Sequence, residues 1–446
     1  MSNLSEWLPN YKVVVGDYTD PHPTFDSLTA DLPFVGKEER EGRSYNIPVV
    51  VSLEQGQTAD VSGDAFLIRD PRNSVMKEAT VNGASLLYSA RIPYDAMLRS
   101  RNGTGNKKQG NAFKDAFLLK AKMLMEQGEH YNEVAMHYGP GVGATIADDI
   151  GVIGPSGGAG TALNSGSGLT LPITIATWAP GVWSRLSNGL FDLYNAAGNT
   201  LIANNLTLSV VNPDYAPAGS PIAPNVTLVA TTTGNQQTTT GPTSNLAACY
   251  GGRLLPAGWA QKSCIGVVSR LKNTGIQDGI NAALYPIWRP TQITVSSGTL
   301  TRLRIQSIAA RVYSLGVTGG FTMRVSGPIF ADLAEETETQ RQYVDDGEVR
   351  KVSPTKLVYR TPAGPGEIKL DAMMKYGTVI GYGKQAKGKR VGTSPLTFRG
   401  KGEEWFFTEL ANNAGSEIRC MANQSPFFDE PNKTFIVSGL TPNALI

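Results

Sequence analysis

The chain has 446 residues, of which 41% are hydrophobic and 17% are charged, so it can bury a real core and is not globally disordered. Forty Lys and Arg against 38 Asp and Glu leave a net charge of +2, which excludes the strong basicity of a dedicated nucleic-acid-binding protein. The length allows about two to four domains, or one domain that carries insertions.

Residues 1–44 are predicted to form an extended N-terminal arm. Prolines interrupt every possible helix in it, at Pro9, Pro21, Pro23 and Pro33. The arm carries large aromatic side chains but no local core to receive them: Trp7, Phe25 and Phe34. We therefore expect the arm to lie on another surface.

Residues 45–94 are predicted to form one long β-hairpin. The run YNIPVVVSL (45–53) is rich in β-branched residues, and residues 79–94 alternate in the same way, with a charged, turn-rich tip between them. A two-stranded hairpin of this length is marginal in water unless it lies on a surface. The alternative, two strands of a compact sheet, has about equal weight on this evidence alone.

A helix is predicted over residues 110–128, after a basic linker that contains Arg99 and Arg101. Its apolar residues recur with a period of 3.6 and occupy more than one side, as expected for a strut packed within its domain and against a neighbour. Asn111 is the expected N-cap, and Gly128 is expected to end the helix in a left-handed conformation.

The composition changes after this helix. Only five charged side chains occur between residues 139 and 250: Asp148, Asp149, Arg185, Asp192 and Asp214. A glycine-rich loop (154–168) is followed by short apolar or Thr-rich strands with turns between them. Evenly spaced strands of this kind predict a small β-barrel or sandwich, inserted over residues 166–250.

The remainder is predicted to mix helices and strands. A helix with Leu303, Ile305, Ile308 and Val312 on its apolar face is expected within 299–316, and another begins near Pro328. Three alternating runs after residue 403 predict a terminal β-meander. The fold class is therefore α+β.

Three segments in this order resemble the major capsid protein family of tailed bacteriophages, which has the Johnson fold shared with the herpesvirus capsid floor and encapsulin shells. The first is NIPVVVSLEQGQT, closing with SARIPYDAM and followed by the helix. The second is WAPGVWSRLSNGLFDLYNAAG, and the third is EWFFTELANNAGSEIRCMANQSPFFDEPNKTFIVSGL. The resemblance covers nearly the whole chain.

The resemblance implies a Johnson-type fold with these parts: N-arm 1–44; extended hairpin (E-loop) 45–94; spine helix and first part of the peripheral domain 95–165; β-rich insertion 166–250; axial domain with return to the peripheral domain 251–402; and closing peripheral strands 403–446. It further implies a subunit that self-assembles through pentamers and hexamers into an icosahedral head around double-stranded DNA. Portal, scaffolding and cement proteins are the implied partners. An encapsulin-like nanocompartment shell is the alternative, and a tail or fibre protein is a weaker one.

The expected inter-subunit contacts lie in the arm, the hairpin and the basic linker. They are Trp7, Phe25, Phe34, Arg69, Asp70, Arg72, Lys77, Glu78, Arg99 and Arg101. A basic loop, GYGKQAKGKR, adds Lys384, Lys387, Lys389 and Arg390, which could face packaged DNA through phosphates or lie near a symmetry axis; the second interpretation is preferred. Some family members join a hairpin lysine to an asparagine, but nothing around Lys77, Asn423, Asn432 or Glu430 requires this, so no cross-link is predicted.

No enzymatic site is predicted, and no catalytic residue, cofactor or metal. The glycine-rich loop lacks the GK[ST] ending of a P-loop, and no serine stands in a GxSxG motif. The three cysteines and three histidines match no zinc spacing. Without a signal-peptide pattern or an apolar run near 18 residues, the chain is expected to be soluble, with no membrane partner, and to be made in a cytoplasm. The resemblance implies that this is the cytoplasm of a host bacterium and that the chain ends in the virion.

Overall fold

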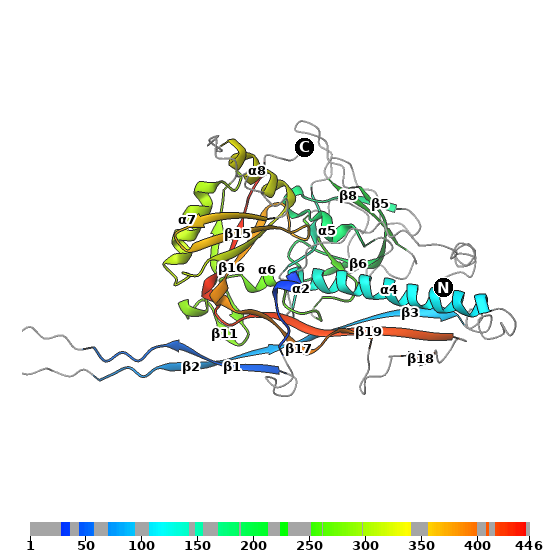
Figure 1. Cartoon of the computed structure of the whole chain (residues 1–446), viewed down its shortest axis with the longest axis horizontal. Coiled ribbons are helices and arrows are strands. Elements are labelled where there is room, and N and C mark those ends of the chain that lie inside the picture. Colours follow the sequence, from blue (N-terminus) through cyan, green and yellow to red (C-terminus); the bar gives the residue numbers. More distant parts are fainter. Residues whose placement is uncertain are drawn as a thin grey trace, which may run out of the picture.

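The computed structural model describes residues 28–35, 44–57, 70–93, 107–141, 148–154, 168–186, 189–212, 224–230, 251–260, 262–296, 298–339, 356–398, 407–409 and 415–442. The helices of four or more residues within these ranges are α2 (Leu28–Asp31), α4 (Lys107–Tyr138), α5 (Pro180–Trp183), α6 (Val267–Arg270), α7 (Arg302–Tyr313) and α8 (Gly327–Thr339). Figure 1 shows α4 lying along a long sheet at the base of the molecule, with two further β-rich bodies above it.

The hairpin consists of β1 (Ser44–Ser52) and β2 (Val75–Asn82), which pair antiparallel from Ser44–Asn82 outward. The next strand, β3 (Ala84–Pro93), does not continue it but pairs with β19 (Gly415–Phe428). The prediction of one hairpin over 45–94 is therefore wrong for residues 84–93. β2 and β3 are separated at Gly83. A Cβ at this position would lie 2.2 Å from Asn423 Oδ1 and 3.0 Å from the Gly392 Cα, so glycine allows the chain to pass this close to β17 and β19.

The long sheet at the base also contains β17 (Gly388–Thr397) and β18 (Phe407–Glu409), both paired with β19. α4 lies on this sheet and is longer than predicted, because Gly128 continues the helix instead of ending it. A Cβ at Gly128 would contact Tyr88 at 3.2 Å and Leu396 at 3.3 Å, so its role is close packing against β3 and β17. The helix ends before Gly139, whose Cβ would meet the Cys264 carbonyl oxygen at 2.1 Å.

The inserted body is a six-stranded antiparallel sheet in the order β4-β9-β6-β7-β8-β5. Its strands are β4 (Gly151–Val152), β5 (Gly168–Pro172), β6 (Leu190–Tyr194), β7 (Leu201–Asn212), β8 (Asn225–Ala230) and β9 (Arg253–Pro256). Its two edges meet: Gly154 N donates to the Pro172 oxygen and Thr174 N to the Val152 oxygen, each at 2.8 Å. The sheet is therefore barrel-like, and it extends beyond the predicted range 166–250 on both sides.

The third body is a six-stranded mixed sheet in the order β12-β20-β16-β13-β15-β14. Its strands are β12 (Thr291–Thr294), β13 (Phe321–Val325), β14 (Lys356–Thr361), β15 (Gly364–Leu370), β16 (Thr378–Gly383) and β20 (Thr434–Ser438). α7 and α8 pack on it through a core that includes Ile305, Ile329 and Phe435. Leu303, predicted on the buried face of α7, is 78% exposed instead.

The position of β20 corrects the predicted terminal meander. β20 lies between β12 and β16, parallel to the first and antiparallel to the second, while β19 belongs to the long sheet. Its first four residues are buried, which suits a strand covered on both faces. The end of the chain therefore completes the predicted axial body rather than the peripheral sheet.

One continuous core joins the inserted barrel, α4, α2 and parts of both other sheets. Trp178 and Trp183 stack within it, with ring centroids 5.8 Å apart and an angle of 4° between the planes. The short strand β11 (Ile280–Asn281), which pairs with β10 (Ile276–Gln277), contributes Ile280 to a third core beneath the β1–β2 hairpin. The hairpin is thus held at its base by the body from which it projects.

Candidate functional site

The base of the β1–β2 hairpin is fixed by packing and by charge. Ala79 and Val81 are buried against Trp288 and Phe427, and Thr80 N donates to the Asp278 oxygen at 2.9 Å. The Lys389 ammonium lies 4.6 Å from the centroid of the Tyr45 ring. The hairpin therefore leaves the body in a defined direction.

The distal part of the hairpin exposes apolar side chains on both strands and just beyond them. Val50 is 39% exposed, Leu53 76%, Val75 38% and Met76 60%. Figure 1 shows β1 and β2 running out from beneath the body, and their two-stranded sheet has no further partner among the described strands. Exposed strand edges with apolar side chains favour pairing with another chain.

The structure places some of the expected contact residues on this hairpin and others elsewhere. Asp70, Arg72, Lys77 and Glu78 are exposed on or beside β2. Phe34 is half-buried, with its ring 5.9 Å from the Arg390 guanidinium carbon. The remaining candidates lie outside the described residues: Trp7, Phe25, Arg69, Arg99 and Arg101.

The four basic residues near 381–390 do not form one exposed loop. Lys384 and Lys387 are exposed, whereas Lys389 pairs with Asp429 at 2.8 Å and Arg390 Nε donates to the Leu32 oxygen at 2.7 Å. Burial alone would lower the pKa of Lys389, but hydrogen bonds to Asp429 and Tyr45 outweigh it and raise that pKa. Two of the four cations therefore hold the chain's own segments together.

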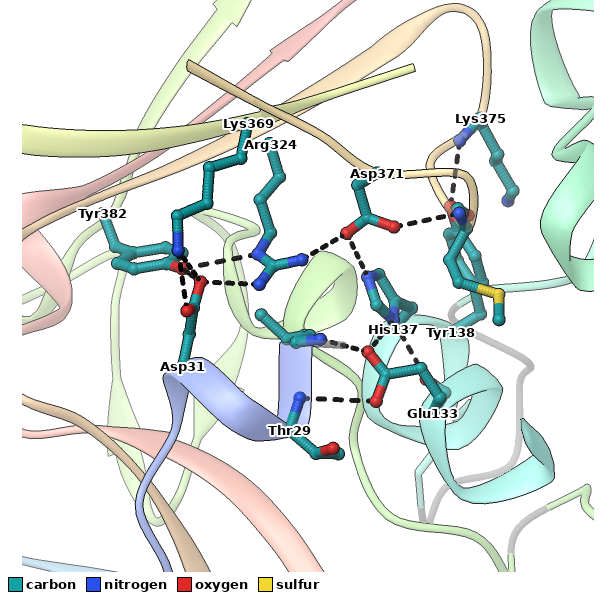
Figure 2. A network of polar contacts seen from close by, with 12 residues as sticks. Thr29, Asp31, Glu133, His137, Tyr138, Arg324, Lys369, Asp371, Lys375 and Tyr382 are labelled. Carbon is teal, nitrogen blue, oxygen red and sulfur yellow. Dashed lines mark hydrogen bonds and ion pairs between the residues drawn. The ribbon is translucent and has the colours of Figure 1, made fainter. Parts of the chain in front are cut away.

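A buried polar network joins α2 and α4 to the mixed sheet (Figure 2). Arg324, on β13, has no exposed side-chain surface; its Nη1 donates to Asp371 at 2.9 Å and its Nη2 to Asp31. The pKa of Asp371 is lowered below its usual range, because the charges of His137 and Arg324 outweigh the effect of burial. An arginine in an otherwise apolar strand, FTMRV, was the available sequence signal for this network.

Asp31 connects α2 to this network. Its carboxylate accepts from Arg324, from Lys369 Nζ at 2.8 Å and from the Tyr382 hydroxyl at 2.8 Å. Burial raises the pKa of Asp31, but these cationic and hydroxyl donors lower it further than burial raises it. The short α2 segment is therefore held on the mixed sheet by a charged side chain.

His137 and Glu133 of α4 complete the network. His137 Nε2 lies 3.1 Å from Asp371 Oδ2, and His137 Nδ1 lies 2.9 Å from the Glu133 carbonyl oxygen. The Glu133 carboxylate accepts from the backbone amides of Leu28 and Thr29. The histidine spacing was compared only with zinc patterns, which gave no sign that His137 contacts Glu133 and Asp371 in a buried network.

A second cluster lies beside the first. Lys375 Nζ donates to both Asp148 and Asp149 at 3.1 Å, and Arg253 approaches Asp149 at 3.6 Å. The Lys375 ammonium also lies 4.6 Å from the centroid of the Tyr138 ring. This cluster ties the edge of the barrel to the mixed sheet and to the end of α4.

The described parts of the chain hold no group of three or more His, Cys, Asp and Glu side chains that could bind a metal ion. Among the helices of the same residues, none combines the length and the apolar character needed to cross a bilayer.

Comparison with solved structures identifies chains of similar fold. The cyanophage A-1(L) capsid asymmetric unit is 11% identical, with 96% of each chain covered and a TM-score of 0.51. The capsid of an empty GTA particle is 6% identical, covering 95% of this chain and 99% of that one, with a TM-score of 0.45. No protein-family model and no curated protein matches the sequence. The first similarity confirms the predicted fold: the chain has the Johnson-type capsid fold.

Proposed function

We propose that this chain is the major capsid protein of a tailed double-stranded DNA bacteriophage, and that copies of it assemble into an icosahedral head around the genome. The observation that carries the proposal is the projecting hairpin, with Leu53 and Met76 exposed at 76% and 60%. The whole-length similarity to a cyanophage capsid chain supports it. In this proposal the chain is structural and has no catalytic role.

Mutual burial between copies is the proposed driving force. Fully burying one large apolar side chain is worth about 1.5–3 kcal/mol, so a few such contacts in each copy suffice to bias many copies towards a shell. A rotationally repeated contact closes into rings, which suits pentamers and hexamers. The near-neutral net charge of +2 keeps repulsion between copies small.

The other expected contacts remain part of the proposal. Asp70, Arg72, Lys77 and Glu78 would form inter-subunit ion pairs, each worth roughly 0–1 kcal/mol when exposed. Lys384 and Lys387 would lie near a symmetry axis or meet packaged DNA. Portal, scaffolding and cement proteins are the proposed partners, and the assembled virion is the proposed location.

Assembly of the purified chain tests the proposal. We expect closed particles by electron microscopy from the wild type. The double variant Leu53→Asp/Met76→Asp is expected to give folded but unassembled subunits, because each aspartate would have to be desolvated in the contact. The matched control is Leu303→Asp, which changes a side chain of similar exposure, 78%, on α7, away from the hairpin and its base, and should preserve particles.

Two results would contradict the proposal. A wild-type chain that stays monomeric at all concentrations would exclude a shell subunit, and a double variant that assembles like the wild type would exclude the hairpin contact.

Particles from the native source that contain an enzyme instead of DNA would favour the nanocompartment. Boiled particles should give a single band on a denaturing gel, because no covalent cross-link is expected.

A further inference from the structure

The network at His137 joins elements that are far apart in sequence. Residues 28–35, which we term the strap, lie against both α4 and the mixed sheet (Figure 2). Leu28, Leu32 and Val35 of the strap are buried, and Val35 N pairs with the Arg390 oxygen at 2.9 Å. Of the elements that meet at the network, α2 in the strap is the shortest, with four residues.

Both nitrogens of the His137 ring face acceptors. Nδ1 lies 2.9 Å from a backbone carbonyl oxygen, which can only accept, and Nε2 lies 3.1 Å from the Asp371 carboxylate, which accepts when ionised. A neutral imidazole has one N–H, so it satisfies only one of these partners. The geometry therefore fits the doubly protonated ring.

The protonated ring lies between two of the carboxylates of a charged network. The carboxylates are Asp31, Glu133 and Asp371, and the cations are Arg324, Lys369 and protonated His137. Arg390, from β17, adds a favourable interaction with Glu133. Loss of the His137 proton removes the positive charge between Glu133 and Asp371, inside a region where unpaired charge is costly.

We propose that protonation of His137 controls docking of the strap. The protonated ring keeps Glu133 and Asp371 together and the strap docked, and deprotonation of the ring releases the strap from α4 and the mixed sheet. Glu133 carries the effect, because it contacts His137 and also accepts from the first two amides of the strap. Asp31 and Asp371 share Arg324, so the change in charge beside Asp371 also affects Asp31 at the other end of α2.

The sign of the pH dependence follows from the surroundings of His137. Burial alone would lower its pKa, but Asp371 and Glu133 raise it above the usual value. The stabilisation is therefore complete below about pH 6.5, the ordinary value for histidine, and is lost as the pH rises through the raised value. Strap release is an alkaline event in this scheme.

Hydrogen–deuterium exchange of the full-length, unassembled chain tests the proposal between about pH 6 and about pH 9.5, with rates corrected for the intrinsic pH dependence of amide exchange. Protection of the strap amides should fall by about tenfold for each unit by which the His137 pKa is raised, while β20 amides keep theirs. His137→Gln, which cannot be doubly protonated, should show low strap protection at every pH.

His130 provides the matched control, because it is buried on the same helix. Its Nε2 has one acceptor, the Val182 oxygen at 3.0 Å, and burial lowers its pKa to about 4. His130→Gln should therefore keep the wild-type pH dependence of the strap. If His137→Gln fails to fold, the pH dependence of strap protection in the wild type, with the β20 amides as internal reference, still tests the proposal.

Strap protection that does not change with pH in the wild type would overturn the proposal, and so would strap and β20 protection that fall together. Strap release does not rest on the proposed function, since it would stand in the unassembled chain even if no particles formed. Particle formation together with pH-independent strap protection would leave the proposed function intact and would exclude control of the strap by His137.

Discussion

Arg324 shows how one buried side chain can determine the relation between distant segments. Its guanidinium lies between Asp371, which follows β15, and Asp31 of α2, and burial prevents water from replacing either partner. Breaking one partner of a buried pair costs more than the pair itself contributes, because a charge is left uncompensated. The role of Arg324 is therefore mainly to make one arrangement of the segments preferable to others.

Asp371→Asn tests this at the scale of a residue. Removing this carboxylate should lower the free energy of unfolding of the unassembled chain by about 3–5 kcal/mol, because Arg324 and His137 both lose it. Urea denaturation measures the difference. Glu126→Gln is the control, since it removes a partly exposed pair with Lys122 at 3.5 Å and should cost no more than about 0.5 kcal/mol. A loss below about 1 kcal/mol for Asp371→Asn would show that the network adds little.

Among the elements, the β1–β2 hairpin depends most on its attachment. Lys389 contacts the Tyr45 ring and Asp429 while its side chain is 16% exposed, so it joins β1 to the end of β19. The packing of Ala79 and Val81 below it fixes the same strands from the other side. The orientation of the distal apolar residues is set at this base.

Lys389→Ala should loosen the hairpin while leaving the rest of the chain folded. The lost cation–π contact and hydrogen bonds are worth about 1–2 kcal/mol, so amide exchange in β1 and β2 should accelerate roughly tenfold. Lys384→Ala, an exposed lysine five residues earlier, is the control and should change nothing. Equal exchange in the two variants would show that apolar packing alone holds the base.

The elements also show what could be predicted from the sequence. Periodicity located α4, α7, α8 and most strands, and the segment order indicated the Johnson-type fold. It did not locate α5, nor α2, which lies in an arm predicted to be extended and free of helix. Two errors lie at glycines that allow close packing: Gly128 continues α4 against β3 and β17, and Gly83 lets the chain leave the hairpin beside Asn423 and Gly392. Strand pairing across long separations, such as β20 with β12, is set by burial on both faces, which local patterning cannot reveal.

The buried network was not predicted for a related reason. Its charged members come from segments separated by hundreds of positions, as Asp31 and Arg324 are, and apart from Arg324 in the strand FTMRV each looks like an ordinary surface residue locally. Lys389 and Arg390 show the converse, because a run of positive charge suggested an exposed loop. Only their tertiary partners reveal that both are used internally.

At the scale of the whole molecule, apolar contact rather than net charge should control assembly. The net charge is +2, and screening lengths fall from about 30 Å in 0.01 M salt to about 3 Å in 1 M salt. The critical concentration for particle formation should therefore change by less than about tenfold between about 0.05 and about 0.5 M salt. Sedimentation measures it, and a change of several powers of ten would assign the contacts to ion pairs.

The central place of β20 in the mixed sheet has a consequence for synthesis. A ribosome delivers β20 after every other strand of that sheet, so β12 and β16 lack their common neighbour until the segment emerges. Phe435, which packs edge-on against Phe321, is missing until then as well. Under the proposed function, an interrupted translation product cannot present a finished subunit, so folding itself keeps incomplete polypeptides out of the particle.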